Sequence, residues 1–459
     1  MKQTAVNRFS SWEIAKRNAW VNAAKVVLVL LHVLAAAVVW DQIYVKQNIT
    51  MSFTRCELAL AIYTFFFVLM CHAYDAFRVE LMDTGELAYS LSLAQLITIL
   101  FQYLLLSFSL ERLLDVKGAL VLFIAGVALN ILWSGLMVRL YRRAFPPRRT
   151  YVICDHTNRF RALEDLHLLD WKFQLVDVLD ISSGTDCIQS RLRDAEAVIL
   201  INIHSCDRNR LLKYCIIHNI QVYIRPKVGD LLMRGGSQLQ LLNVPMVRCG
   251  RCRKGMTFLF LKRTMDIVFS GLALILLSPV MAVTAVLIRR YDHGPALYRQ
   301  TRLTQDGREF EILKFRSMRM DAEKDGVARL ATENDDRITP IGRFIRAIRL
   351  DELPQLINII KGDMSLVGPR PERPELAAQY EKQMPEFGLR LQVKAGLTGY
   401  AQVYGKYNTR PYEKLQMDLL YIARQSVLLD LKLMFLTVKI LFQKESTEGI
   451  EEGNTSAMK

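Results

Sequence analysis

The chain has 459 residues, of which 51% are hydrophobic, and it carries 60 Lys and Arg against 45 Asp and Glu, a formal net charge of +15. This combination predicts two or three domains, with apolar membrane spans and with basic faces that meet lipid headgroups, phosphates or nucleic acid. The 8 cysteines have no paired spacings, which argues against a disulfide-rich secreted protein. Cys249 and Cys252 have the spacing of half a zinc site, but no second pair or nearby histidine completes it.

Four apolar runs come first in the chain, and each is long enough to cross a membrane as a helix: residues 20–40, 56–76, 89–110 and 119–141. Basic residues precede the first run and follow the fourth, so both ends of this bundle are expected on the cytoplasmic side. We interpret the sparse polar residues inside the runs as helix-packing contacts: His32, Gln95, Gln102 and Asn130. A transporter is therefore disfavoured.

A soluble α/β module follows, because four short apolar segments alternate with helical ones. The expected strands are residues 151–154, 173–180, 197–203 and 221–226. This alternation predicts a Rossmann-like parallel sheet. The turn after the first strand, Asp155 to Asn158, lacks the glycines that let a pyrophosphate approach the backbone. A structural or regulatory module is thus favoured over a dinucleotide site.

The fifth apolar segment, residues 264–288, has basic residues on both sides, and a straight span cannot place both flanks in the cytoplasm. Ser278 and Pro279 lie in its middle, where proline removes a helix hydrogen bond. We expect a re-entrant helix that breaks at these two residues and returns to the same leaflet. The alternative is an ordinary proline-kinked span, but a fifth crossing would carry the rest of the chain outside.

A later apolar segment, residues 427–442, carries Lys432 and Lys439 seven positions apart. One basic stripe on an apolar helix is typical of an in-plane interfacial helix on anionic lipid, so this segment is expected at the inner leaflet. The tail from Glu445 onward is acidic and polar, which is typical of a disordered segment.

The chemistry concentrates between residues 314 and 370. Three arginines recur at spacing three and end at an adjacent acid pair, Asp351 and Glu352. Such a stripe is often only a solvated helix face. Other cations support phosphate binding, however: Lys314, Arg316, Arg346 and Arg370. Two acids suit Mg²⁺ bound together with substrate phosphates, and an aspartate can act as a nucleophile. The residues alone thus indicate phosphoryl transfer at a membrane surface.

Four long blocks resemble the bacterial sugar transferases, the monotopic phosphoglycosyl transferases that start capsule, exopolysaccharide and O-antigen synthesis. The blocks are "YRQTRLTQDGREFEILKFRSM", "IGRFIRAIRLDELPQLINIIKGDMSLVGPRPERPE", "VKAGLTGYAQVYGKYNT" and "DLLYIARQSVLLDLKL". The resemblance runs from about Lys262 to Phe442, and the preceding spans and α/β module resemble the larger members of the family. It implies transfer of a sugar-1-phosphate from a UDP-sugar to undecaprenyl phosphate with Mg²⁺ and release of UMP.

The resemblance also implies site residues. Asp351 would carry a phosphosugar intermediate, and Asp351 and Glu352 would bind the metal. Lys314, Arg316, Arg346 and Arg370 match basic positions that bind substrate phosphate. Asp418 and Asp430 match two further acids, and Ser278 with Pro279 matches the break of the re-entrant helix. The chain departs from the family pattern at Ala395, at Tyr400 and in "IARQS", which leaves glucose, galactose and N-acetylated sugars open as the substrate.

The expected architecture is a membrane protein of class α plus α/β in the bacterial cytoplasmic membrane. A four-span bundle occupies residues 1–147, the Rossmann-like module 148–250 and a mainly α catalytic domain 251–459, on the cytoplasmic face. The bundle and the module offer surface for a homodimer. Two other classes were weighed. A decayed, non-catalytic scaffold is disfavoured by the intact acid pair, and a nucleic-acid binder lacks a stacking pattern of aromatic and basic residues.

Overall fold

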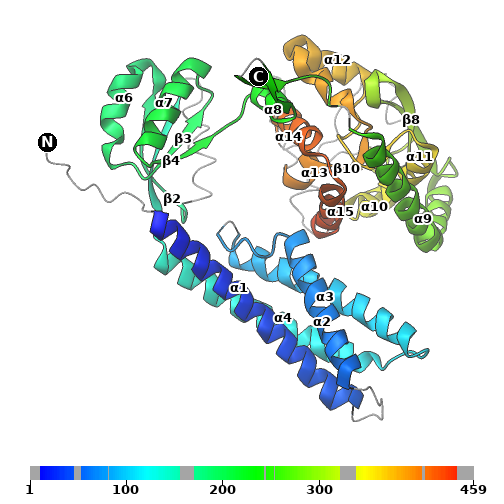
Figure 1. Cartoon of the computed structure of the whole chain (residues 1–459). Helices are drawn as coiled ribbons and strands as arrows, with labels where there is room; N and C mark the ends of the chain where they lie inside the picture. Colours follow the sequence, from blue (N-terminus) through cyan, green and yellow to red (C-terminus); the bar gives the residue numbers. More distant parts are fainter. Residues whose placement is uncertain are drawn as a thin grey trace. The chain divides into compact units, whose positions relative to one another are not determined.

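The computed structural model describes residues 11–45, 53–80, 82–155, 170–241, 244–252, 254–320, 337–405 and 409–441. The chain divides into two compact units, Met1–Arg225 and Pro226–Lys459 (Figure 1). The division lies before the boundary expected after residue 250. The reason is that α8 (Val228–Arg234) packs against α14 (Pro411–Arg424), with Leu231 buried in the core of the second unit.

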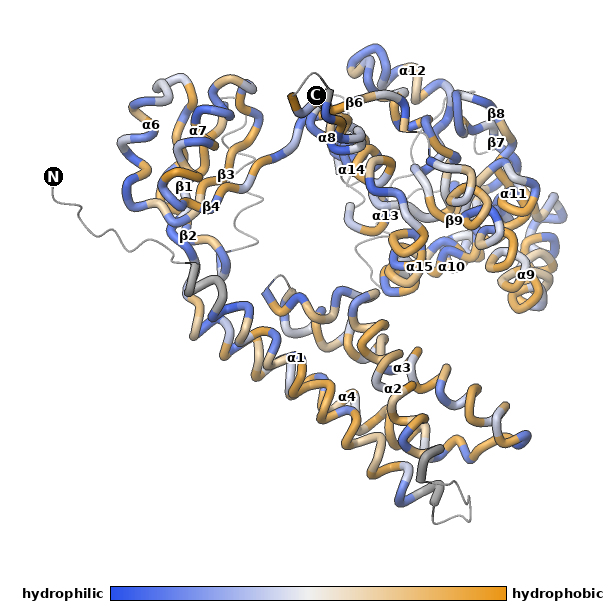
Figure 2. Tube along the Cα trace, in the orientation of Figure 1, coloured by the Kyte–Doolittle hydropathy of each residue, from blue (hydrophilic) through white to orange (hydrophobic). Residues whose placement is uncertain are grey.

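Four long helices begin the first unit: α1 (Ser11–Val39), continued by a short π-helix (Trp40–Val45), then α2 (Phe53–Ala73), α3 (Thr84–Ser109) and α4 (Val116–Ala144). Each predicted apolar run coincides with one of them to within a few residues, and all four are long and apolar enough to cross a membrane. Hydrophobic residues predominate along these helices (Figure 2), and many of their apolar side chains are exposed, with Phe108 and Leu132 at 86% and 72% exposure. The prediction of N-terminal membrane helices is confirmed.

Polar side chains inside this bundle connect neighbouring helices. The Gln95 amide on α3 donates to Leu122 O on α4 at 2.9 Å, and Asn130 on α4 donates to Gln95 Oε1 at 3.0 Å. Gly126 makes room for this contact, because a Cβ at that position would overlap the Gln95 amide. Small residues and bridging amides are the usual means by which helices pack in lipid. These contacts agree with the helix-packing role expected from the sequence.

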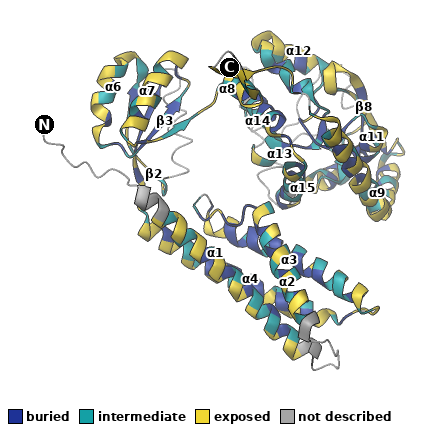
Figure 3. Ribbon diagram, in the orientation of Figure 1, coloured by how far each residue is buried: buried dark blue, intermediate teal, exposed yellow. Residues whose placement is uncertain are grey.

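The α/β module contains one parallel sheet in the order β2-β1-β3-β4: β1 (Arg148–Cys154), β2 (Phe173–Asp180), β3 (Ala197–Ile201) and β4 (Gln221–Ile224). Its helices include α6 (Thr185–Arg191) and α7 (Ser205–Ile217), whose outer faces are exposed while their inner residues join the buried strands in one core (Figure 3). The predicted parallel sheet is confirmed. The turn that lacks glycine lies, after Asp155, outside the described residues.

The second unit is mainly helical with short strand pairs. After α8 come antiparallel β5 (Ser237–Leu241) and β6 (Val244–Arg248), then the long helix α9 (Met256–Asp292). Antiparallel β7 (Leu297–Leu303) and β8 (Glu309–Phe315) follow, and parallel β9 (Ser365–Val367) and β10 (Gly396–Thr398) form a third pair. The other helices are α10 (Pro340–Ala347), α11 (Gln355–Lys361), α12 (Pro374–Gln383), α13 (Tyr400–Tyr404), α14 and α15 (Val427–Leu441).

Helix α9 continues through Ser278 and Pro279, so the predicted break in the helix is not present. Proline has no N–H to donate to the carbonyl of Ile275 one turn earlier. The Ser278 hydroxyl donates to that carbonyl instead, at 2.8 Å. A hydroxyl that satisfies the freed carbonyl lets a proline remain inside a helix in an apolar environment.

One stripe of α9 packs along the second unit. Its buried residues form two groups, one near the start of the helix and one near its end: Lys262, Met265, Asp266 and Ser270, and then Thr284 and Ile288. Between them, Ala273 and Leu274 pack on the main core, and Met281 and Ala285 pack beside Ile345 of α10. The opposite face exposes apolar side chains, among them Leu272, Ile275 and Val283. Helix α9 therefore lies against the unit over most of its length.

Helix α15 differs from the interfacial helix expected for residues 427–442. Leu433 and Leu436 are buried, and Lys439, expected on an exposed basic stripe, is only 5% exposed. The reason is that α15 packs against α9, α13 and the β9-β10 pair. One face of α15 thus packs in the second unit, while Leu428 on this helix is 79% exposed. The acidic tail after residue 441 lies outside the described residues.

Candidate active site

A left-handed arginine positions the acid pair. Helix α10 ends at Ala347, and Arg349 then adopts φ +53°, a conformation that non-glycine residues rarely take. A single 3₁₀ turn, Leu350–Glu352, follows directly. Holding a residue in this left-handed backbone conformation costs of order 1–3 kcal/mol, and such residues tend to occur at functional sites. The turn places Asp351 and Glu352 at the end of the arginine-bearing helix.

Three cations surround the Glu352 carboxylate. Oε1 contacts Arg370 at 3.0 Å and Lys314 at 3.4 Å, while Oε2 contacts Arg349 at 3.6 Å. Burial raises the pKa of Glu352, but Arg370, Lys314 and Arg349 together outweigh burial and hold its pKa well below the usual range. Glu352 is therefore ionised at neutral pH, and both of its oxygens are already in contact with cations.

Asp351 has the opposite environment. Burial, followed by the neighbouring charge of Glu352, raises the pKa of Asp351 to about 6, while Lys314, Arg346 and Arg370 oppose the rise. Its carboxylate makes no hydrogen bond or ion pair with any described residue. Of the two acids, Asp351 is the one whose oxygens remain available to a substrate or a metal ion.

The strand that carries Lys314 is held by an amide from α11. Asn358 accepts from Leu313 N at 3.0 Å and donates to Glu311 O at 2.8 Å, so its side chain pairs with β8 as a neighbouring strand would. Asn358 is 2% exposed. Lys314 is thereby fixed relative to the acid pair, which lies just before α11.

Arg370 is supported from behind by a buried ion cluster. Arg390 donates to the Arg370 carbonyl at 2.9 Å and forms ion pairs with Asp418 at 2.7 Å and Glu372 at 3.3 Å. Burial raises the pKa of Asp418 to about 6, against the effect of Arg390. Asp418, predicted as a further site acid, thus contacts Arg390 and not the acid pair.

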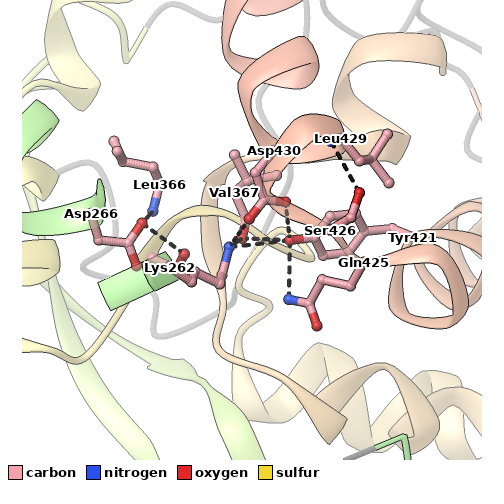
Figure 4. Close-up of polar contacts among 10 residues, drawn as sticks. Lys262, Asp266, Leu366, Val367, Tyr421, Gln425, Ser426, Leu429 and Asp430 are labelled. Carbon is pink, nitrogen blue, oxygen red and sulfur yellow. Dashed lines mark hydrogen bonds and ion pairs between the residues drawn. The ribbon is translucent and has the colours of Figure 1, made fainter. Parts of the chain in front are cut away.

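Asp430 belongs to a second buried cluster, at the start of α9 (Figure 4). It pairs with Lys262 at 2.5 Å and accepts from the Tyr421 hydroxyl at 2.8 Å, and both of these partners donate to Val367 O. One turn further along α9, Asp266 accepts from Leu366 N at 3.0 Å. These contacts join α9, α14 and α15 to the strand that leads to Arg370.

Arg316 is paired with an acid other than Glu352. Its guanidinium forms a short ion pair with Asp292 at the end of α9. Together with Thr339 and apolar neighbours it lines a cavity of about 190 Å³. The structure thus brings Lys314, Arg346 and Arg370 to the acid pair, while Arg316 ends at α9, and Ser278 and Pro279 lie in the middle of that helix.

Two residues of the site escaped the sequence reasoning. Arg302 and Gln355 line an open pocket together with Lys314, Glu352 and Arg370, with about 240 Å³ of empty space, open solvent included. The signal for Arg302 was present in "YRQTRL", since a strand of that length places alternate side chains on one face. The strand that pairs with the one carrying Arg302, and the register of that pairing, could not be predicted from the sequence.

The metal-binding prediction can be compared with this geometry. Within the described part of the chain no three His, Cys, Asp or Glu side chains gather as a metal-binding set. A Mg²⁺ ion bound largely by substrate phosphates needs only one or two carboxylates. Asp351 fits that role. Glu352 fits it less well, because both of its oxygens already face cations.

Comparison with known proteins gives a family match within the second unit. Residues 257–444 match the family model of bacterial sugar transferases. The chain is 33% identical, over 60% of its length and 62% of the relative's, to a UDP-N-acetylgalactosamine-undecaprenyl-phosphate N-acetylgalactosaminephosphotransferase of Aeromonas hydrophila.

Two UDP-glucose:undecaprenyl-phosphate glucose-1-phosphate transferases are also similar. The Escherichia coli protein is 37% identical over 55% of this chain and 56% of its own length. The Caulobacter vibrioides protein is 40% identical over 40% of this chain and 71% of its own length. The chain thus spans less than two thirds of the first two relatives and more than two thirds of the third.

Proposed function

Because the chain belongs to the bacterial sugar transferase family, we propose that it transfers a sugar-1-phosphate from a UDP-sugar to undecaprenyl phosphate. The products are undecaprenyl-diphosphate-sugar and UMP, and the reaction is the first membrane step of extracellular polysaccharide synthesis. The observation that carries this proposal is the contrast within the acid pair. Glu352 is enclosed by three cations, while Asp351 makes no hydrogen bond or ion pair with any described residue.

In the first step Asp351 attacks the sugar-bearing phosphorus of the donor. A bond forms between a carboxylate oxygen and phosphorus, and the bond from phosphorus to the bridging oxygen breaks, so UMP leaves with that oxygen. Lys314, Arg346 and Arg370 are the cations whose charge acts on Asp351. They neutralise the charge that develops on the phosphate oxygens in the transition state.

In the second step an oxygen of undecaprenyl phosphate attacks the same phosphorus. The bond to Asp351 breaks, and the free carboxylate returns for the next cycle. The covalent intermediate separates an aqueous donor from a lipid acceptor, so the two anionic substrates need not meet directly. Because both attacks occur at the same phosphorus, the single carboxylate of Asp351 is enough for both steps.

Asp351 would hold Mg²⁺ together with the donor phosphates, and the ion would supply further neutralisation of the diphosphate charge. Glu352 would act on the cations instead. It fixes Arg370 and Lys314 beside Asp351, and its negative charge keeps the pKa of Asp351 high enough to make the carboxylate a stronger base.

We further propose that both ends of α9 lie on the cytoplasmic side of the membrane. Its buried stripe supports this path, because a helix that contacts one compact unit from Lys262 to Ile288 does not carry its two ends to opposite faces. Basic residues on both flanks favour the same side. A cysteine at Tyr291, in a chain without its native cysteines, should react with impermeant reagents only from the cytoplasm. Reaction from the periplasm would exclude the path.

The test of the function is UMP release by the full chain in lipid. UDP-glucose, UDP-galactose and their N-acetylated forms would each be supplied with undecaprenyl phosphate and Mg²⁺. We expect release with at least one of these donors, dependent on the acceptor lipid for continued turnover. No release with any of them from folded protein would contradict the proposal.

A further inference from the structure

Arg302 and Lys314 share one face of the β7-β8 pair. Arg302 lies opposite Phe310, and Tyr298 lies opposite Lys314. Directly opposed residues in an antiparallel pair point to the same side, and so do residues two apart on one strand. Both cations therefore belong to the face that lines the open pocket beside Glu352.

The bonds that Arg302 makes leave its charge unmatched. Its Nη1 donates to Pro371 O at 3.1 Å and its Nη2 to Gln300 Oε1 at 2.7 Å, and both acceptors are neutral. Its Nε–H is buried and has no partner among the described residues. A buried donor without an acceptor is costly, so this N–H favours an acceptor such as a water or a ligand oxygen.

The neighbouring charges support the same conclusion. Burial, and next Arg370, lower the pKa of Arg302 to about 10, and Glu372 only partly opposes them. The pocket is lined by three cations, Arg302, Lys314 and Arg370, and by one carboxylate, Glu352. Three positive charges against one negative charge leave two positive charges unmatched at this wall.

We propose that Arg302 is a binding residue for the diphosphate of the nucleotide donor, acting together with Lys314 and Arg370. This inference rests on the proposed function. The two negative charges of the diphosphate ester match the excess positive charge of the residues that line the pocket. Guanidinium groups bind phosphate oxygens by paired N–H donors. The polar lining suits this aqueous group better than the chain of a lipid.

The test is a binding measurement with UDP as the probe and uridine as the uncharged comparison, on the full chain in lipid nanodiscs. Arg302→Gln should weaken UDP binding on the order of 10- to 100-fold, the effect of losing one charged hydrogen-bonding group. Uridine binding should not change. Arg302→Lys keeps the positive charge but loses the paired N–H donors of the guanidinium. Its UDP affinity should lie between those of the wild type and Arg302→Gln.

The matched control is Arg299→Gln on the same strand, where the side chain is exposed and pairs with Glu311. It should leave UDP affinity unchanged. In turnover, Arg302→Lys should raise the KM for the UDP-sugar without changing the dependence on undecaprenyl phosphate. Unchanged UDP affinity in both folded Arg302 variants would overturn the assignment. Arg302-dependent UDP binding in a wild type that releases no UMP would instead overturn the proposed function.

Discussion

The buried pair of Lys262 and Asp430 offers the sharpest stability prediction. Their side chains are 10% and 0% exposed, and they join the membrane-associated helix α9 to α15. Lys262→Met keeps the apolar stem but leaves Asp430 buried without its cation. Breaking a buried pair in this way costs about 3–5 kcal/mol. For a unit of this size, about 2–4 °C per kcal/mol corresponds to a fall in Tm of about 6–20 °C.

The assay is thermal unfolding of the full chain in detergent, with two comparison variants. Arg299→Met breaks an ion pair with Glu311 whose side chains are 68% and 63% exposed, and it should cost only about 0–1 kcal/mol. The double change Lys262→Met with Asp430→Leu removes both charges and should recover most of the lost stability. A loss for Lys262→Met no larger than for Arg299→Met, or no recovery in the double variant, would refute this reasoning.

Three further outcomes concern activity. UMP release should fall as pH drops through about 6, because Asp351 must be ionised to attack and its ionised fraction is about half at pH 6 and about a tenth at pH 5. Glu352→Gln should lower the rate at neutral pH and move the acid limb of the pH–rate profile to lower pH. An unmoved limb would argue against Asp351 as the titrating group. Removal of Mg²⁺ by chelation should abolish release and re-addition should restore it, so activity that survives chelation would exclude the metal. Asp418→Asn should weaken the hold of Arg390 on Arg370 and lower kcat about tenfold, and a rate equal to wild type would show that this ion cluster is not needed to position Arg370.

Local patterns in the sequence predicted much of the fold. The sequence predicted the four apolar runs and the strands near 151–154 and 173–180, because these patterns involve only residues that are close together in the chain. The acid pair was found because Asp351 and Glu352 are adjacent in the chain. Arg302 was missed because its approach to Lys314 depends on the register between two strands.

Features that depend on tertiary packing were predicted less well. Proline removes a backbone donor, which predicted a break at Pro279, but the hydroxyl of Ser278 supplies the missing hydrogen bond. The spacing of Lys432 and Lys439 predicted an exposed stripe, yet Lys439 is buried where α15 packs against neighbouring elements. Asp418 and Asp430 carry no sequence mark that distinguishes an acid in a buried ion pair from one in a catalytic site.

The central claim is that Asp351 forms a covalent bond to the sugar-bearing phosphate, and peptide mass analysis tests it most directly. The wild type would be incubated with the UDP-sugar that supports UMP release, without lipid acceptor, and then digested. We predict one added sugar-phosphate on the peptide that contains Asp351, loss of that mass after undecaprenyl phosphate is added, and no adduct in Asp351→Asn, whose turnover should fall by several orders of magnitude. An adduct on another residue, or normal turnover by Asp351→Asn, would contradict the account.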